Sequence, residues 1–274
     1  MKAVTLARKA VHLRPSEARV LLDDAFLLAW NRVARARELT WSPELRAALH
    51  RNRSIQGVAR GERCWILGGG ASLAGLELGA LRGEHVFILD PVGLAARPEV
   101  LACAPRYLVA TGRTDDAPAW NAETAEALAR FGPDTWIFAE PDDHACMAKQ
   151  ASLATHRRFV VVPNQRFVFG YDREVDLTRG IPGTEDTAKT AIAIAVWMGF
   201  RRINLLGVDD DGVLSTGHEA DGDQTALERS LVRSSLGLRG WRALVAYLER
   251  RQIALVSMSP HSVLTGLPTE PFAV

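Results

Sequence analysis

The chain has 274 residues, of which 47% are hydrophobic and 24% charged, and its formal net charge is +1. These values are ordinary for a globular protein with a substantial core, and the near-neutral charge excludes a general nucleic-acid-binding surface. No apolar stretch approaches the roughly twenty residues needed to span a bilayer, and the N-terminal residues lack the apolar core of a secretory signal. Three cysteines have neither metal-ligand nor disulfide-framework spacing, so we expect a reduced, cytoplasmic protein.

Residues 1–60 predict a helical N-terminal extension. Apolar residues recur at helical spacing over Ser16–Arg37, and a second short helix is expected over Ser42–Arg51, with Pro43 in its first turn. The extension is expected to pack on the main domain or on a partner subunit in a homo-oligomer. Its arginines indicate a solvated surface rather than a binding patch.

The segment after residue 62 predicts a strand followed by a glycine-rich turn. The buried run Cys64–Leu67 leads into Gly68, Gly69 and Gly70, and Ser72 stands where a helix over Leu73–Leu81 would begin. Glycine permits a sharp turn, including one with positive φ, and a close backbone approach, while a helix N-terminus attracts anions such as phosphate. The same pattern also suits a plain tight connection. Arg63 and Arg82 are the nearest basic residues in the sequence.

A second strand, Val86–Leu89, ends in Asp90 about twenty residues after the turn, where an acidic side chain often binds a ribose hydroxyl. Asp90 followed by Pro91 is equally typical of a simple turn. Neither the G-x-G-x-x-G fingerprint nor the P-loop lysine is present.

From residue 63 onward, strand-like and helix-like segments alternate. Buried strands between amphipathic helices predict an α/β fold with a doubly wound, Rossmann-like, mostly parallel sheet over residues 61–274. Polar residues follow most strands, and ligands of such sheets bind at the carboxyl ends of the strands. The expected strands are Cys64–Leu67, Val86–Leu89, Tyr107–Ala110, Thr135–Ala139, Phe159–Val162, Ile203–Leu206 and Ile253–Ser257, and the helices between them Ala119–Phe131, Asp142–Thr155, Thr184–Gly199 and Trp241–Arg251.

Residues 180–223 form a second informative block. Thr184 is a suitable N-cap for the alanine-rich helix that Gly199 closes, and Gly183 with Thr184 is assigned to a base, a sugar or a structural role. The following strand delivers Asp209 to the carboxyl edge. Residues 210–238 contain few large apolar side chains and are expected to form a lid that closes over bound ligand.

Together these motifs resemble two families. The Gly-rich-Ser-Leu turn is similar to the Gly-Asn-Gly-Pro-Ser-Leu motif of bacterial lipooligosaccharide sialyltransferases, and to the Gly-Pro-Ser-Leu motif of proteins that resemble archaeal 6-hydroxymethylpterin diphosphokinase. The run from Ala191 to Asp209, the later His218 and the closing Ser259–Leu264 add to the likeness. The chain departs from the sialyltransferase motif at Gly69, Ala71 and Asp90, where that family has Asn, Pro and Asn, which puts the identity of the donor in doubt.

The resemblance implies a nucleotide-dependent transferase. In the glycosyltransferase hypothesis, a sugar moves from a CMP-sugar donor to a cell-surface glycan without a cofactor. Its general base is His218, Asp209 orients the site, and the nucleotide binds Gly68, Gly69, Gly70, Ser72, Asp90, Gly183 and Thr184. The alternative is a Mg-ATP-dependent diphosphokinase acting on a small pterin-like alcohol, with Asp209 and Asp211 as Mg²⁺ ligands. A third possibility is a catalytically inactive scaffold, and His218 alone would also suit a solvated loop.

Overall fold

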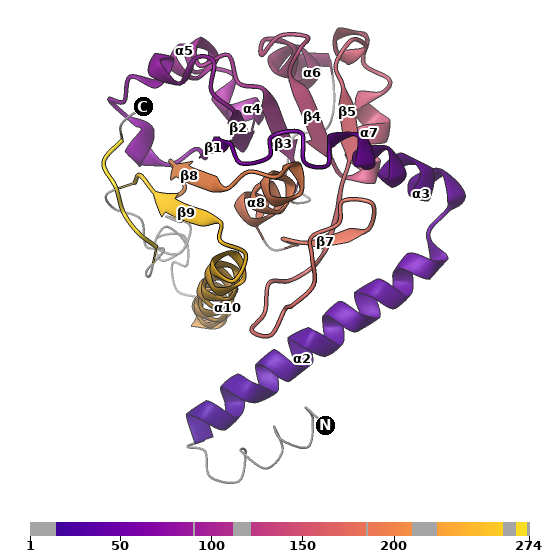
Figure 1. The fold of residues 1–274 in the computed structure, drawn as a ribbon, viewed down its shortest axis with the longest axis vertical. Coiled ribbons are helices and arrows are strands. Elements are labelled where there is room, and N and C mark those ends of the chain that lie inside the picture. The colour runs from indigo at the N-terminus through magenta and orange to yellow at the C-terminus, as the bar shows by residue number, and fades with distance from the viewer. Residues whose placement is uncertain are drawn as a thin grey trace.

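A computed structural model of the chain describes residues 15–89, 91–111, 122–184, 186–209, 224–259 and 267–272. Its centre is a seven-stranded sheet with the strand order β5-β4-β3-β2-β1-β8-β9, and every neighbouring pair is parallel (Figure 1). The predicted doubly wound α/β fold and all seven predicted strands are therefore confirmed. The strands are β1 (Arg63–Leu67), β2 (Val86–Leu89), β3 (Tyr107–Ala110), β4 (Trp136–Ala139), β5 (Arg158–Val160), β8 (Arg202–Leu206) and β9 (Ala254–Ser257).

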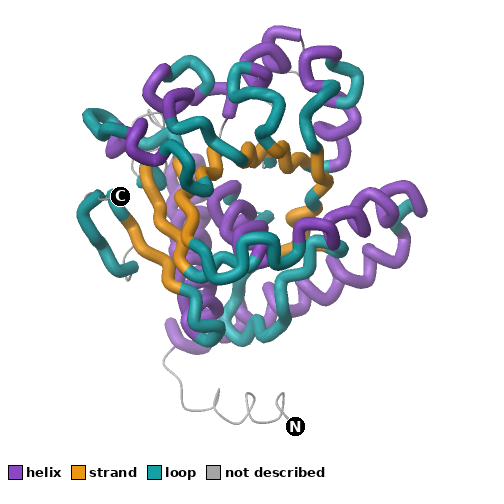
Figure 2. Tube along the Cα trace, turned by 45° about the horizontal axis from the view of Figure 1, so that its top comes forward, coloured by secondary structure: helices purple, strands orange, loops and turns teal. Residues whose placement is uncertain are grey.

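Helices cover both faces of this sheet (Figure 2). Successive residues of a strand point to opposite faces, so Ile66 of β1 packs into one core cluster while Trp65 and Leu67 pack into the other. The first face is covered by α8 (Thr187–Met198) and α10 (Gln224–Glu249). The second face is covered by α4 (Pro91–Leu94), α5 (Pro98–Ala102), α6 (Ala122–Ala129) and α7 (Pro141–Met147).

The alanine-rich helix α8 is almost entirely buried and packs against β1, β2 and β3. It ends at Gly199, whose φ of 97° gives the left-handed C-cap that the sequence predicts. Its N-cap is Asp186, whose carboxylate accepts the N–H of Ala188 at 2.7 Å. The prediction that Thr184 caps this helix is wrong, because the chain enters α8 two residues later.

The N-terminal segment forms α2 (Pro15–Arg37), a 3-10 turn over Glu38–Thr40, and α3 (Pro43–His50). Helix α3 has Pro43 in its first turn, as predicted, and Ser42 is its N-cap. Figure 1 shows α2 as a long helix at the side of the body.

The residues after α3 belong to the core, although the sequence places them in the extension. Ile55, the last residue of the 3-10 turn over Arg51–Ile55, and Ala59, in the loop that follows, are fully buried. The Asn52 amide donates to the carbonyls of Val160 and Leu177, at 2.7 and 2.8 Å. These bonds fix the segment against the sheet.

Several elements differ in extent from the prediction. A small parallel pair, β6 (Val162–Gln165) and β7 (Gly180–Pro182), lies outside the main sheet and was not predicted. The helix predicted over Asp142–Thr155 is α7 followed by a separate 3-10 turn, Ala151–Leu153. Within the ranges that the structure describes, no helix is both long and apolar enough to cross a membrane.

Candidate functional site

The sheet changes winding direction between β1 and β8. From β1 the chain adds β2 to β5 on one side, and it then returns to place β8 and β9 on the other side. Such a topological switch point is where open α/β sheets bind their ligands, at the carboxyl ends of the strands. The two motif blocks found in the sequence, around Gly68 and around Asp209, are the exits of β1 and β8 and meet at this point.

Two of the three glycines are required because the exits of β1 and β8 approach each other closely. The Gly68 N–H donates to the Leu206 carbonyl at 2.8 Å, and the Gly70 N–H donates to the Gly207 carbonyl at 2.9 Å. A Cβ on Gly68 would lie 2.3 Å from the Gly207 oxygen, and one on Gly70 would lie 2.3 Å from Asp209 Oδ2. None of the three glycines has a positive φ, so close approach rather than an unusual backbone conformation explains them.

Gly69 differs from its neighbours because it faces open space. It is exposed, and a Cβ on it would meet nothing within 4 Å. The N–H groups of Gly69 and of exposed Ala71 donate no hydrogen bond to any residue that the structure describes. These amides are therefore available to an external acceptor at the switch point.

A cation that the sequence analysis missed lies beside this turn. Half-buried Arg97 precedes α5, and its Nη2 lies 3.5 Å from the Gly69 carbonyl oxygen. The expected nearest basic residue, Arg63, instead pairs with Glu84 at the start of β1, on the opposite edge of the sheet. Arg97 lies between α4 and α5, a short way along the chain from the carboxyl end of β2, and the signal for it was this nearness to the edge where ligand-binding residues of such folds gather.

The α-helix predicted after the glycine turn is absent. Ala71–Leu73 forms a 3-10 turn, Gly75 follows with φ +80°, and Leu78–Leu81 forms a second 3-10 turn. Leu73, Leu78 and Leu81 are buried, which explains their helix-like spacing. The expected contribution of a helix dipole to anion binding is therefore lost, and backbone amides and Arg97 remain as the groups that favour an anion.

A hydrogen-bond network joins the segments that follow β8, β1 and β9, through Asp209, Ser72 and Ser259. Ser72 donates both its N–H and its hydroxyl to the Asp209 carboxylate, at 2.8 and 2.5 Å. Since that hydroxyl proton is committed to Asp209, the hydroxyl of Ser259, 2.8 Å away, donates to Ser72 Oγ. The Gly207 N–H in turn donates to Ser259 Oγ at 3.2 Å.

This network gives Asp209 a positioning role. Its side chain is 4% exposed, and each of its carboxylate oxygens accepts a bond from Ser72. It holds the turn that carries Gly69 in one conformation. Sequence analysis placed Ser72 in a nucleotide cradle, and the structure adds that its N–H is already bonded within the protein.

Gly183 and Thr184 lie further along the same edge of the sheet. Both donate their N–H groups to the Gln165 carbonyl, at 3.0 and 3.2 Å, and Gly183 has a φ of +130°. The nearby hydroxyl of Thr187 donates to the Thr111 carbonyl, which places the start of α8 at the carboxyl end of β3. A Cβ on Gly183 would lie 2.5 Å from Thr190 Oγ1, so tight packing explains this glycine without a ligand.

Three predicted site residues, Asp90, Asp211 and His218, lie outside the described residues. The described part of the chain contains no group of three acidic, histidine or cysteine side chains placed to hold a metal ion. Of the lid predicted over 210–238, the part from Gln224 onward is the beginning of α10.

A buried lysine is a further feature that the sequence analysis missed. Lys189, in the first turn of α8, is fully buried, and its Nζ donates to the Gly237 carbonyl of α10 at 3.2 Å. It also lies 3.9 Å from Asp186 Oδ2 and 5.4 Å from the centre of the Trp241 ring. This lysine holds α10 against the end of α8 nearest the carboxyl edge.

Comparisons of the chain with protein-family models, with curated proteins and with solved structures give no match. The resemblance to the two transferase families rests on the sequence motifs alone.

Proposed function

We propose that this protein is a nucleotide-dependent transferase that binds its donor at the switch point between β1 and β8. The observation that carries the proposal is the exposed Gly69 turn, with Arg97 Nη2 3.5 Å from its carbonyl oxygen and two unbonded N–H groups, at Gly69 and Ala71. An arginine and oriented backbone amides together suit a phosphate group.

The proposed reaction is transfer of a sugar from a CMP-sugar donor to a hydroxyl of a cell-surface glycan. The Gly69 turn and Arg97 hold the phosphate of the donor, and Asp209 keeps the turn in place through Ser72. His218, the general base that the resemblance implies, takes the proton of the acceptor hydroxyl. The acceptor oxygen then bonds to the sugar carbon as the bond from that carbon to the phosphate oxygen breaks, and CMP leaves.

The burial of Asp209 favours the glycosyltransferase over the diphosphokinase. The diphosphokinase needs Asp209 as a Mg²⁺ ligand, whereas both carboxylate oxygens of this buried side chain already accept bonds from Ser72. We place the activity in the cytoplasm, because the three cysteines are free thiols and two of them are buried, as suits a reducing compartment.

The experiment is a thermal unfolding series with CMP, CMP-sugars and ATP, each with and without Mg²⁺. A ligand present at a hundred times its dissociation constant stabilises the folded state by about 2.7 kcal/mol. The proposal expects stabilisation by CMP or a CMP-sugar without metal. Stabilisation by ATP only with Mg²⁺ would support the diphosphokinase, and no effect of any nucleotide would support an inactive scaffold.

A further inference from the structure

Helix α2 has two apolar faces, and only one of them packs against the part of the chain that the structure describes. On the used face, Leu27 and Leu28 pack against the core, and Asn31 exchanges two hydrogen bonds of 2.9 Å with the backbone of Arg166. Arg35 on the same face donates to the Gln165 side chain at 3.2 Å. These contacts fix α2 on the body and leave its opposite face pointing outward.

The outward face carries a row of large apolar side chains. Leu22 is 71% exposed, Phe26 66%, Trp30 45% and Val33 52%. Single exposed apolar residues are common, but a row of four on one helix indicates an interaction surface. We call this row, together with the exposed Ala29 within it and the exposed Ala36 after it, the outer face of α2.

The spacing of this face is that of a coiled-coil seam. Leu22, Phe26, Ala29, Val33 and Ala36 follow one another at intervals of four, three, four and three residues, which is the heptad pattern. The larger side chains, Leu22 and Phe26, come first along it, and the smaller Ala29, Val33 and Ala36 follow. Such a seam is completed by a second helix with the same repeat.

The order of large and small residues selects an antiparallel copy of the same helix. With a two-fold axis near residues 27 and 28, Phe26 faces Ala29 of the second copy and Leu22 faces Val33 of the second copy. A parallel pair would instead set Phe26 against Phe26 and leave a gap at Ala29. Large-against-small contacts fill the space between helices without strain or voids.

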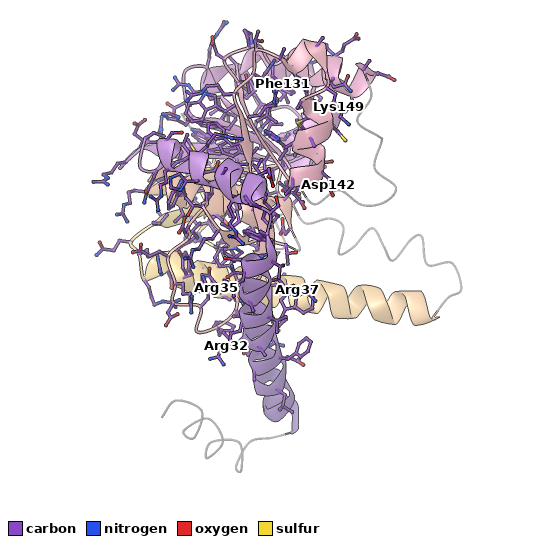
Figure 3. All side chains as sticks on the ribbon, turned by 90° about the vertical axis from the view of Figure 1, so that its right-hand side faces the viewer. Arg32, Arg35, Arg37, Phe131, Asp142 and Lys149 are labelled. Atoms are coloured by element: carbon purple, nitrogen blue, oxygen red, sulfur yellow. The ribbon has the colours of Figure 1, made fainter. Side chains whose placement is uncertain are left out.

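Charge on the helix favours the same arrangement. In the N-terminal half, Asp23 and Asp24 share one cation, Arg239, at 3.0 and 2.6 Å, and the side chain of Asp23 is still 44% exposed. Exposed Arg32 and Arg37, labelled in Figure 3, lie in the C-terminal half. An antiparallel pair brings each acidic half beside a basic half and opposes the two helix dipoles, whereas a parallel pair places like charges together. A helix that lies on an anionic membrane has basic residues along its polar flank, and Asp23 does not suit that partner.

We propose that the outer face of α2 binds the same face of a second copy of this chain, in an antiparallel, two-fold symmetric dimer. Two aromatic and two aliphatic side chains from each copy bury on the order of 1,000 Å² in total, the lower end of specific interfaces. The dimer therefore dissociates on dilution. This inference does not depend on the proposed transferase activity.

Sedimentation velocity of the full chain over a wide concentration range tests the dimer. We expect the parent and the control Leu39→Glu to be dimeric at high concentration, since Leu39 is 80% exposed but lies beyond the end of the helix. Phe26→Glu should weaken the dimer by at least about 100-fold, because a central aromatic is lost from both copies. At concentrations low enough for the parent to be monomeric, the two should have the same unfolding temperature, because this side chain is exposed in the monomer.

A parent that is monomeric at every concentration, or a Phe26→Glu variant that dimerises normally, would overturn the proposal. A monomeric parent that binds anionic vesicles through Phe26 would overturn it in favour of a membrane surface.

Cysteine cross-linking tests the orientation. The double variant L22C/V33C should form a covalent dimer on oxidation, while L22C and V33C alone should not. The two positions are about 16 Å apart along one helix, too far for a disulfide within the chain. Cross-linking of the single variants as strongly as the double variant would show a parallel pair and refute the antiparallel arrangement.

Discussion

A methyl group added at Gly70 should destabilise the protein, while the same group added at the adjacent Gly69 should not. A Cβ on Gly70 would lie 2.3 Å from Asp209 Oδ2 and 2.7 Å from the Gly207 oxygen, whereas one on Gly69 meets nothing within 4 Å. In Gly70→Ala the Asp209 carboxylate has to move, and its two bonds to Ser72 lengthen or break.

The expected loss of stability in Gly70→Ala follows from these contacts. Overpacking of a filled site costs about 1–3 kcal/mol, and loss of a hydrogen bond to a charged group costs about 1.5–3 kcal/mol. The two costs do not add in full, because a movement of the Asp209 carboxylate that relieves the overpacking also weakens its hydrogen bonds to Ser72. We therefore expect Gly70→Ala to lower the free energy of unfolding by about 2–4 kcal/mol. That corresponds to a fall in the unfolding temperature of roughly 5–15 °C for a chain of this size.

Urea denaturation of the parent, Gly70→Ala and Gly69→Ala is the assay. Gly69→Ala is the matched control, with a change of less than about 0.5 kcal/mol expected at an open surface position. Equal stability of the two variants would refute the reasoning, because it would mean that the exits of β1 and β8 are not packed against each other at Gly70.

Three further predictions concern the site and the thiols. Arg97→Ala should weaken nucleotide binding by about 10–100-fold in calorimetry, through loss of a charge-assisted hydrogen bond, and leave the unfolding temperature unchanged. His218→Ala should lower turnover by about 10²–10⁴-fold and abolish the fall in rate at acid pH, with donor affinity retained; full activity would remove His218 from the mechanism. In the folded protein a thiol reagent should modify half-buried Cys146 first, because burial raises the pKa of Cys103 to about 11 and that of buried Cys64 well above its ordinary value. Equal labelling rates for all three would contradict the packing of the sheet.

The strands, and the polar residues that follow them, were predictable because a buried strand is a short run of apolar residues in the sequence. Each expected strand, such as Cys64–Leu67, is a short apolar run that is followed by polar residues, and the structure places all seven in one parallel sheet. Gly199 was predictable for a similar reason, since it ends a periodic apolar segment and its φ of 97° suits glycine.

The segment after the glycine turn was not predictable from its apolar spacing. Leu73, Leu78 and Leu81 are buried in two 3-10 turns as well as they would be in one helix, and Gly75 interrupts the segment with φ +80°. The pair β6 and β7 was missed because Gln165 and its polar neighbour Asn164 break any apolar alternation.

The contacts within the candidate site were not predictable, because they join residues that are far apart in the sequence. Asp209 was identified from the sequence, but its bonds to Ser72 were not, because they join residues 137 positions apart. Arg97 reaches the Gly69 turn from the segment between α4 and α5; its nearness in sequence to the end of β2 was visible, but the contact itself was not.

The central claim is that a nucleotide phosphate binds at the Gly69 turn, and calorimetric titration of CMP into the parent, Gly69→Val and Gly79→Val tests it most directly. Both glycines are exposed, both have open space around the Cβ position and neither has a positive φ, so valine is tolerated by the fold at each, and Gly79 lies outside the turn. We predict that the parent and Gly79→Val bind with equal affinity, while Gly69→Val binds at least about 100-fold more weakly because its side chain fills the space of the phosphate. Binding of CMP by Gly69→Val with the affinity of the parent would contradict the claim.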